Sequence, residues 1–309
     1  QIYIFFIIFL LGTQLTAVER NIGIEKKKLN ADEWMKKVDT LKWYNEEGKN
    51  ISIKIPGSNA KLNIYDNEQY LLGQDIDQYD WWAYGRSYAD DAIRVFADGY
   101  SYSIRKPNND GFVKIDDWSD VSPETLIQSL RDANKDKGDG LSYAKEINWI
   151  YRPNLDRERN LVTYSYKVVW NDNAITMESK NIILGREGHI NQIFVFGDLT
   201  NTKENADFAK VASRDTTFNT GYTYQDFKSG DKIAAAGIGA LVATSLGVKA
   251  LKSSGGAAAA AGGLALILKK FWWILLAPLA FLGKLFRGGD NGQSNNTPKP
   301  KRKNKKKND

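Results

Sequence analysis

Aspartates are the residues whose type and spacing could most readily do chemistry in this chain. Asp75, Asp77 and Asp80 lie within one short stretch, and Asp90 and Asp91 follow soon after. Paired carboxylates can hold a divalent cation or act as general acid and base in hydrolysis. Acidic loops are also normal on an acidic protein surface, and we expect this second explanation to hold here. Asp75, Asp77 and Asp80 are therefore weak catalytic candidates.

Most other catalytic chemistries lack the residues they need. The chain has no cysteine and one histidine, so a zinc or thiol centre has no ligand set. That histidine, His189, has no Gly-x-Ser-x-Gly elbow to serve, and we expect it to face solvent after a Gly-rich turn. Residues 132–136 begin like a calcium loop, but Lys137 stands where glycine is required. The sequence predicts no catalytic residue, cofactor or metal, and favours a protein that is not an enzyme.

Three short helices are predicted from their capping signals. Asn30 and Asn201 each precede a glutamate by three residues, and Ser122 precedes Pro123, which suits a first helical turn. The apolar positions expected to face the core are Trp34, Val38 and Leu41 in the first helix, Leu126, Ile127 and Leu130 in the second, and Phe208, Val211 and Ala212 in the third.

Alternating apolar residues predict strands between these helices. The stretches are 51–55, 61–65, 93–104, 162–170, 175–184 and 190–196. The chain after residue 140 looks like a meander of four antiparallel strands joined by tight turns. We therefore expect an α+β domain, with an antiparallel sheet and helices on one of its faces. The aromatic group Trp81, Trp82 and Tyr84 is expected to pack in the core.

Charge divides the chain into two parts. Residues 18–230 carry 29 Lys and Arg against 34 Asp and Glu, whereas residues 231–309 carry 14 against three. The overall net charge of +6 therefore averages an acidic domain with a basic end. A nucleic-acid partner is not expected, because the folded part is acidic.

The front of the chain resembles a secretory signal peptide. Residues 2–11 are an unbroken apolar run that leads into small residues and then into charge at Glu19 and Arg20. We expect residues 1–17 to be the signal peptide, with its basic first part missing from the sequence, and residues 18–230 to be exported. The mature chain would then begin near Val18.

The back of the chain is predicted to be a membrane anchor. Residues 231–287 contain three uncharged runs rich in Gly, Ala and aromatic residues, interrupted by lysines. Each run is short for a full span, so we expect transmembrane or amphipathic helices, with one crossing favoured over two. Residues 288–309 form a basic tail, expected to be disordered and cytoplasmic. The predicted partners are membrane lipid, an envelope protein, or a second copy bound through the small-residue anchor helices.

The chain contains several distinctive short motifs, namely Gly111-Phe-Val113, Asp116-Asp117, Asn148-Trp149 with Pro153, and the stretches 218–227 and 230–238. Together they resemble one bacterial family of uncharacterised membrane-anchored proteins, domain-of-unknown-function family 2167. The resemblance covers about residues 96–287 and implies a signal peptide, an exported domain and a C-terminal anchor. It implies no activity or cofactor. The family often carries a histidine near Pro153, where this chain reads Tyr151-Arg152-Pro153-Asn154.

Three functions stay open at this point. The first is a membrane-anchored extracytoplasmic domain, with its main part periplasmic at the inner membrane, that binds a partner or maintains the envelope without catalysis. The alternative is a carboxylate-dependent periplasmic hydrolase, which would need its carboxylates gathered in one pocket with raised pKa values. The third is an oligomer-forming or membrane-active protein that acts through its Gly/Ala helices.

Overall fold

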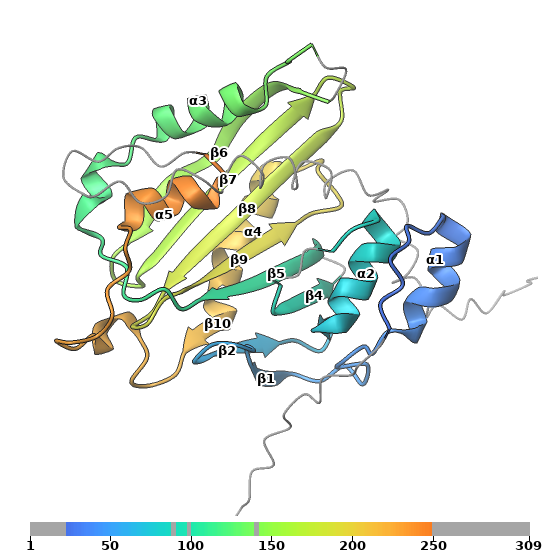
Figure 1. The fold of residues 1–309 in the computed structure, drawn as a ribbon, viewed down its shortest axis with the longest axis horizontal. Coiled ribbons are helices and arrows are strands. Elements are labelled where there is room, and N and C mark those ends of the chain that lie inside the picture. The colour runs from blue at the N-terminus through green and yellow to red at the C-terminus, as the bar shows by residue number, and fades with distance from the viewer. Residues whose placement is uncertain (1–22, 88–90, 98–99, 139–141, 249–309) are drawn as a thin grey trace, which may run out of the picture.

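Two antiparallel sheets form the centre of the fold. The computed structural model describes residues 23–248 except 88–90, 98–99 and 139–141 (Figure 1). A seven-stranded sheet has the order β3-β4-β5-β9-β8-β7-β6, and a three-stranded sheet has the order β1-β2-β10. The strands are β1 (Ile51–Lys54), β2 (Ala60–Ile64), β3 (Gln69–Leu72), β4 (Ile93–Ala97), β5 (Tyr100–Asn108), β6 (Ala144–Asp156), β7 (Leu161–Trp170), β8 (Ile175–Leu184), β9 (His189–Val195) and β10 (Thr216–Phe218). The predicted α+β class with an antiparallel sheet is confirmed.

The meander predicted after residue 140 is present as β6-β7-β8-β9. The stretch 93–104, predicted as one strand, is instead a hairpin in which β4 pairs with β5 and Val95 lies opposite Ser103. The sequence does carry a signal for the reversal, because Asp98-Gly99 between the two arms is typical of a hairpin turn, and the prediction missed it. Strands β3 and β10 were not predicted.

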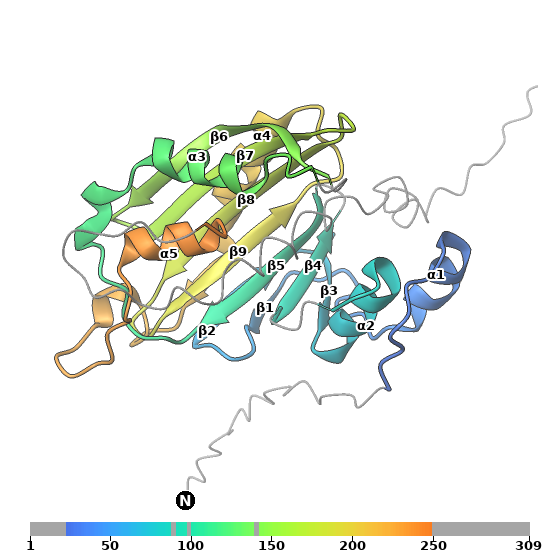
Figure 2. The same ribbon diagram turned by 45° about the horizontal axis from the view of Figure 1, so that its top comes forward.

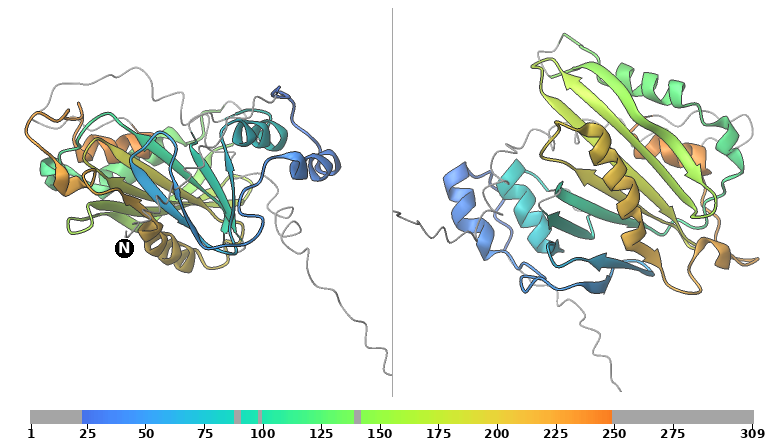
Figure 3. Two further views of the ribbon diagram at one scale, coloured as in Figure 1. Left: turned by 90° about the horizontal axis from the view of Figure 1, so that it is seen from below. Right: turned by 180° about the vertical axis from the view of Figure 1, so that it is seen from behind.

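Helices cover both faces of the large sheet, not one as predicted. The helices are α1 (Ala31–Lys37), α2 (Gln74–Tyr84), α3 (Pro123–Ala133), α4 (Thr202–Val211) and α5 (Ile238–Ser245). Helices α3 and α5 lie on one face, while α4 lies on the other (Figures 2 and 3). The strands require this arrangement because they bury side chains on both sides. Val162 packs with α3 and α5, whereas Phe194 packs with α4.

The capping signals place α1, α3 and α4 correctly. Asn30 forms a capping box with Glu33, Ser122 caps α3 by accepting from the Thr125 amide, and Asn201 caps α4. The buried face predicted for α4 is wrong in part. Phe208 is 41% exposed and Val211 59% exposed, whereas Ala206 and Ala209 face the sheet. Small side chains on the inner face let α4 approach the strands closely and leave its larger residues outside.

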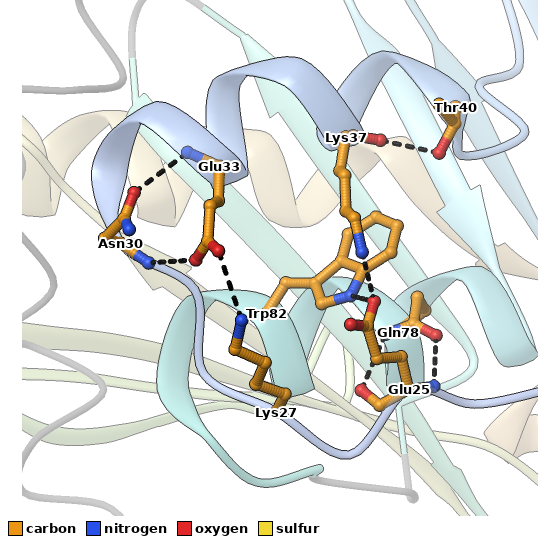
Figure 4. A network of polar contacts seen from close by, with 8 residues as sticks. All are labelled: Glu25, Lys27, Asn30, Glu33, Lys37, Thr40, Gln78 and Trp82. Carbon is orange, nitrogen blue, oxygen red and sulfur yellow. Dashed lines mark hydrogen bonds and ion pairs between the residues drawn. The ribbon is translucent and has the colours of Figure 1, made fainter.

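Helix α2 occupies the stretch that was expected to be an acidic loop. Trp82 and Tyr84 lie in the core as predicted, packed with Phe96 and Tyr102. The segment 23–30, which precedes α1 in the chain, runs between α1 and α2 and is held by polar contacts (Figure 4). The carboxylate of Glu25 accepts from Lys37 Nζ at 2.5 Å and from Trp82 Nε1 at 3.0 Å.

The folded domain extends past the expected boundary at residue 230. Ile238, Val242 and Ala243 of α5 are buried against the sheet, although they belong to the segment 231–287 predicted as the anchor. An uncharged run of this length suits a buried helix as well as a membrane, and here its apolar face meets β7 and β8. No helix in the described residues is both long and apolar enough to cross a bilayer. The predicted signal peptide, the rest of the anchor and the basic tail lie outside the described residues.

Candidate functional site: a cleft beside helix α4

The three candidate aspartates all lie on α2, but each has its own structural partner. Asp75 is buried and accepts from the Lys42 amide at 3.0 Å. Asp77 accepts from Ser87 Oγ at 2.5 Å. Asp80 is wholly buried, which is contrary to the expected surface position. The three carboxylates therefore do not converge on one site.

Asp80 belongs to a buried ion network. Its two oxygens accept from both terminal nitrogens of Arg94, which also binds Asp91 at 2.6 Å. Lys106 Nζ lies 2.9 Å from Asp91 and completes the chain of charges. Burial alone lowers the pKa of Arg94, but the carboxylates of Asp80 and Asp91 outweigh burial and raise it. Charges matched this closely hold the core together and leave the carboxylates little freedom to act on a substrate.

His189 is buried rather than exposed in a turn. It is the first residue of β9 and only 6% exposed. Burial lowers its pKa to about 4, against a smaller opposing effect of Asp110. Nδ1 is a buried nitrogen without a hydrogen-bond partner among the described residues. The side chain is therefore neutral near pH 7. A Ser-His-Asp triad would also need a serine hydrogen-bonded to the ring, whereas His189 Nε2 lies 3.2 Å from Asn191 Nδ2.

A cleft of about 370 Å³ lies between α4, the edge of the small sheet and strands of the large sheet. Its lining comes from five separate parts of the chain, so no local motif could reveal it. The lining residues are Tyr65, Asn67, Glu68, Ala97, Arg105, Phe194, Phe208, Val211, Ala212, Arg214 and Asp215. Its volume is near the lower end of the range for small-molecule sites.

Arg105 is the most deeply buried charge in the lining, at 2% exposed. Its Nη1 donates to Ser103 Oγ at 2.6 Å and its Nε donates to Thr216 Oγ1 at 3.3 Å. The guanidinium carbon lies 5.6 Å from the centre of the Phe194 ring. The two hydroxyls and the ring fix the plane of the guanidinium where it meets the cleft.

Two carboxylates face the same cleft. Asp215 Oδ1 accepts from the Tyr65 hydroxyl at 2.6 Å. Burial raises the pKa of Asp215, although the Tyr65 hydrogen bond and the charge of Arg105 both act to lower it. Glu68 is buried and accepts from the Tyr65 amide at 2.9 Å. The cleft lining therefore carries charges of both signs, with Arg214 as its second cation, in a partly desolvated setting.

Apolar side chains form the rim of the cleft. Phe208, Val211 and Tyr65 are 41%, 59% and 43% exposed, and they are three of the few large apolar side chains exposed in the described part of the chain. The ring of Phe208 meets that of Phe194 edge-on, with centroids 5.8 Å apart. The helical spacing of Phe208 and Val211 marks both residues in the sequence. That spacing predicts core positions, whereas in the structure both side chains lie on the rim of the cleft.

The motif residues at 111–117 and 218–238 lie elsewhere and hold the segment 219–248 to the domain. The Phe112 ring lies against Tyr224 and Phe227, with centroids 4.4 and 4.2 Å away. Gly111 has φ +120°, and a Cβ there would lie 2.7 Å from the Lys232 carbonyl oxygen. This close approach of two backbones explains the glycine.

Two charged residues secure the same segment. Arg186 binds Asp231 through two contacts of 2.7 Å. Asp117 accepts from the amides of Ile238 and Gly239 at the start of α5. A carboxylate there satisfies backbone donors that the helix leaves without partners. The motifs at 111–117 and 218–238 therefore explain how α5 is docked, whereas Asn148 lines a separate cavity of about 450 Å³ beside α3 and β6.

Most of the chain matches one protein family. The family model described as "Protein of unknown function (DUF2167)" matches residues 47–280. The chain belongs to this family. Curated proteins give no match. Among solved structures, this member of the family is similar to the solution structure of cyanobacterial PsbP from Synechocystis sp. PCC 6803, at a TM-score of 0.34 and 8% identity. That similarity covers 56% of this chain and 94% of the cyanobacterial one.

A metal centre finds no support in the described part of this family member. No group of three or more histidine, cysteine or acidic side chains there is arranged to hold a metal ion. The cleft, with its buried cation, two carboxylates and apolar rim, is the candidate functional site.

Proposed function

We propose that this protein is a membrane-tethered extracytoplasmic domain that binds a small ligand in the cleft beside α4. One observation carries the binding part of the proposal. Exposed Phe208 and Val211 gather at the same cavity that holds the buried guanidinium of Arg105. Apolar walls with a few fixed polar groups are typical of ligand sites, and exposed apolar side chains cost the domain solubility unless something covers them.

The location rests on the sequence at either side of the folded domain. The apolar run 2–11 supports export, and the apolar runs after Val248 with the basic tail support an inner-membrane anchor. The tail carries seven Lys and Arg between Lys299 and Lys307. Moving such charges through hydrocarbon costs about 2.5–3.5 kcal/mol each at the helix centre, which favours a cytoplasmic tail.

Binding can be tested by a thermal-shift screen of small metabolites on the full chain in detergent. We expect some compounds to raise the Tm of the wild type and to lose this effect in Val211→Glu, which puts a charge on the rim. Ile175→Glu is the matched control, because Ile175 is 42% exposed and does not line the cleft. The proposal would be overturned if no compound raised the Tm, or if the compounds raised the Tm of Val211→Glu as much as that of the wild type.

A hydrolase is the second candidate, and one feature of the cleft favours it. Glu68 and Asp215 both line the cavity, and burial raises the pKa of Asp215, as suits a general acid. The residues concerned are then not Asp75, Asp77 and Asp80. Mass spectrometry of each cleft ligand after long incubation separates the two candidates. A ligand recovered intact supports binding, and a cleaved ligand whose cleavage stops in Asp215→Asn supports hydrolysis.

The tether has its own test. A tag after Asp309 and protease added to intact spheroplasts should give loss of the acidic domain and survival of a tagged fragment. Loss of the tag would contradict the cytoplasmic tail and place it outside.

A further inference from the structure

Three of the charged side chains that line the cleft have hydrogen-bond partners within the protein. The guanidinium of Arg105 donates to one serine and one threonine hydroxyl. The Asp215 carboxylate accepts from the Tyr65 hydroxyl, and the Glu68 carboxylate accepts from the Tyr65 amide. A charged group that already has partners gains little when a ligand replaces them. These three charges are therefore a weak source of binding energy for a charged ligand.

Arg214 is the remaining charge in the lining, and it is exposed. An ion pair with an exposed guanidinium contributes little, because water competes for both partners. The lining holds two cations and two carboxylates, so its formal charges cancel. A ligand with a net charge would meet groups of its own sign there and would also lose part of its hydration on entry. An uncharged ligand avoids both costs.

Aromatic rings from three parts of the chain form the apolar walls of the cleft. Phe194 of β9 is buried, whereas Phe208 of α4 and Tyr65, which follows β2, are partly exposed. The Phe208 ring lies edge-on to the Phe194 ring, with centroids 5.8 Å apart. The Tyr65 ring is held by its hydroxyl, which donates to Asp215 at 2.6 Å. Walls fixed in this way favour a rigid aromatic ligand, because neither side loses much conformational freedom on binding.

We propose that the cleft binds a small uncharged molecule built on an aromatic ring. The ring packs against the rim residues Tyr65, Phe208 and Val211 and covers their exposed apolar surface. The side-chain amide of Asn67, also in the lining, can donate or accept a hydrogen bond with an uncharged polar group on such a ring. A cavity of about 370 Å³ admits a small ring system. The inference rests on the proposed binding function and names its ligand class.

A set of small probes tests charge and rigidity separately. Isothermal titration of the full chain in detergent would compare indole, which is uncharged and rigid, with indole-3-acetate, tryptamine and 1-octanol. We expect indole to bind at least about tenfold more tightly than the anion indole-3-acetate or the cation tryptamine, because each of these brings a charge out of water. Indole should bind at least about threefold more tightly than octanol, which is uncharged but loses chain freedom on binding. Its affinity should change little between about 0.05 and 0.5 M salt, since no ion pair forms.

A variant then places the binding at the rim. Phe208→Ala should weaken indole about tenfold, because it removes one wall of the cleft. Ile175→Ala is the matched control and should bind indole as the wild type does, since Ile175 is exposed and apolar but lies outside the lining. The same detergent is present with every protein, so the difference between them excludes partitioning of indole into micelles.

The inference is overturned if indole does not bind, if indole-3-acetate, tryptamine or octanol binds as tightly as indole, or if Phe208→Ala leaves its affinity unchanged. If the metabolite screen nevertheless gives charged compounds that depend on Val211, the binding function stands and only the ligand class is wrong. If neither indole nor any screened compound depends on the rim, the binding function fails as well.

Discussion

Two buried arginines on neighbouring strands show how position, and not residue type, decides what surrounds a side chain in this domain. Arg94 on β4 is 1% exposed and Arg105 on β5 is 2% exposed. Each follows an isoleucine, and in the hairpin Arg94 lies opposite Ile104 while Arg105 lies opposite Ile93. Directly opposed residues share a face, so the two guanidinium groups point to opposite sides of one sheet.

The surroundings of the two side chains differ in kind. Arg94 meets the carboxylates of Asp80 and Asp91, and its guanidinium carbon lies 5.0 Å from the centre of the Tyr102 ring. Arg105 donates to two hydroxyls and borders a cleft. The first arrangement surrounds its cation with carboxylates in the core, while the second places its cation in the lining of a cleft.

Asp80→Asn should cost about 3–5 kcal/mol of unfolding free energy, because it removes a charge from a wholly buried ion network. Urea unfolding followed by tryptophan fluorescence measures it. Asp77→Asn, one turn earlier on α2, is the control and should cost about 1 kcal/mol or less, since an amide oxygen can still accept from Ser87. Equal costs for the two variants would show that the Arg94 network does not stabilise the core.

The same pair of arginines explains what the sequence could and could not predict. Caps such as Ser122 with Pro123 act within one turn, and alternation acts within one strand, so α3 and the meander were predictable. Asp80 and Arg94 are 14 residues apart, and Arg105 and Thr216 are 111 apart. Such contacts depend on the assembled sheets. For this reason α2 was mistaken for an acidic loop, and the rim residues Phe208 and Val211 for core.

His189 on the same sheet differs from both arginines, because the core around it disfavours its charged form. Because burial lowers the folded pKa of His189 to about 4 from an ordinary 6.5, the unfolded chain binds more protons between these values. Stability is therefore fully present above about pH 6.5 and falls by about 3 kcal/mol as the pH drops to about 4. Urea midpoints of the wild type and His189→Gln, measured across this range, isolate the effect. Parallel curves for the two proteins would contradict it.

Ser103→Ala tests the hydroxyl that holds Arg105. Removing the acceptor of a charged donor in the core should cost about 1.5–3 kcal/mol, less than breaking the Arg94 network. Ser179→Ala is the matched control, because Ser179 shares a neutral hydrogen bond of 2.8 Å with Ser165. Its expected cost is about 0.5–1.5 kcal/mol. A Ser103 variant as stable as the wild type would mean that the guanidinium finds its support elsewhere, and that the cleft is less rigid than its contacts indicate.

The smallest effect is expected where the sequence first pointed to chemistry. The double variant Asp75→Asn with Asp77→Asn should lose about 1–2 kcal/mol, because each amide keeps an oxygen that can accept from Lys42 or Ser87 and no ion pair is broken. Calcium or magnesium should change the Tm of the wild type and of the variant equally, since these carboxylates are directed to separate protein donors. A large rise in wild-type Tm with either ion, abolished in the variant, would reverse the argument. It would mean that the carboxylates of α2 can leave their present partners and gather on a cation, and that chemistry resides on the Arg94 side of the sheet and not in the cleft beside Arg105.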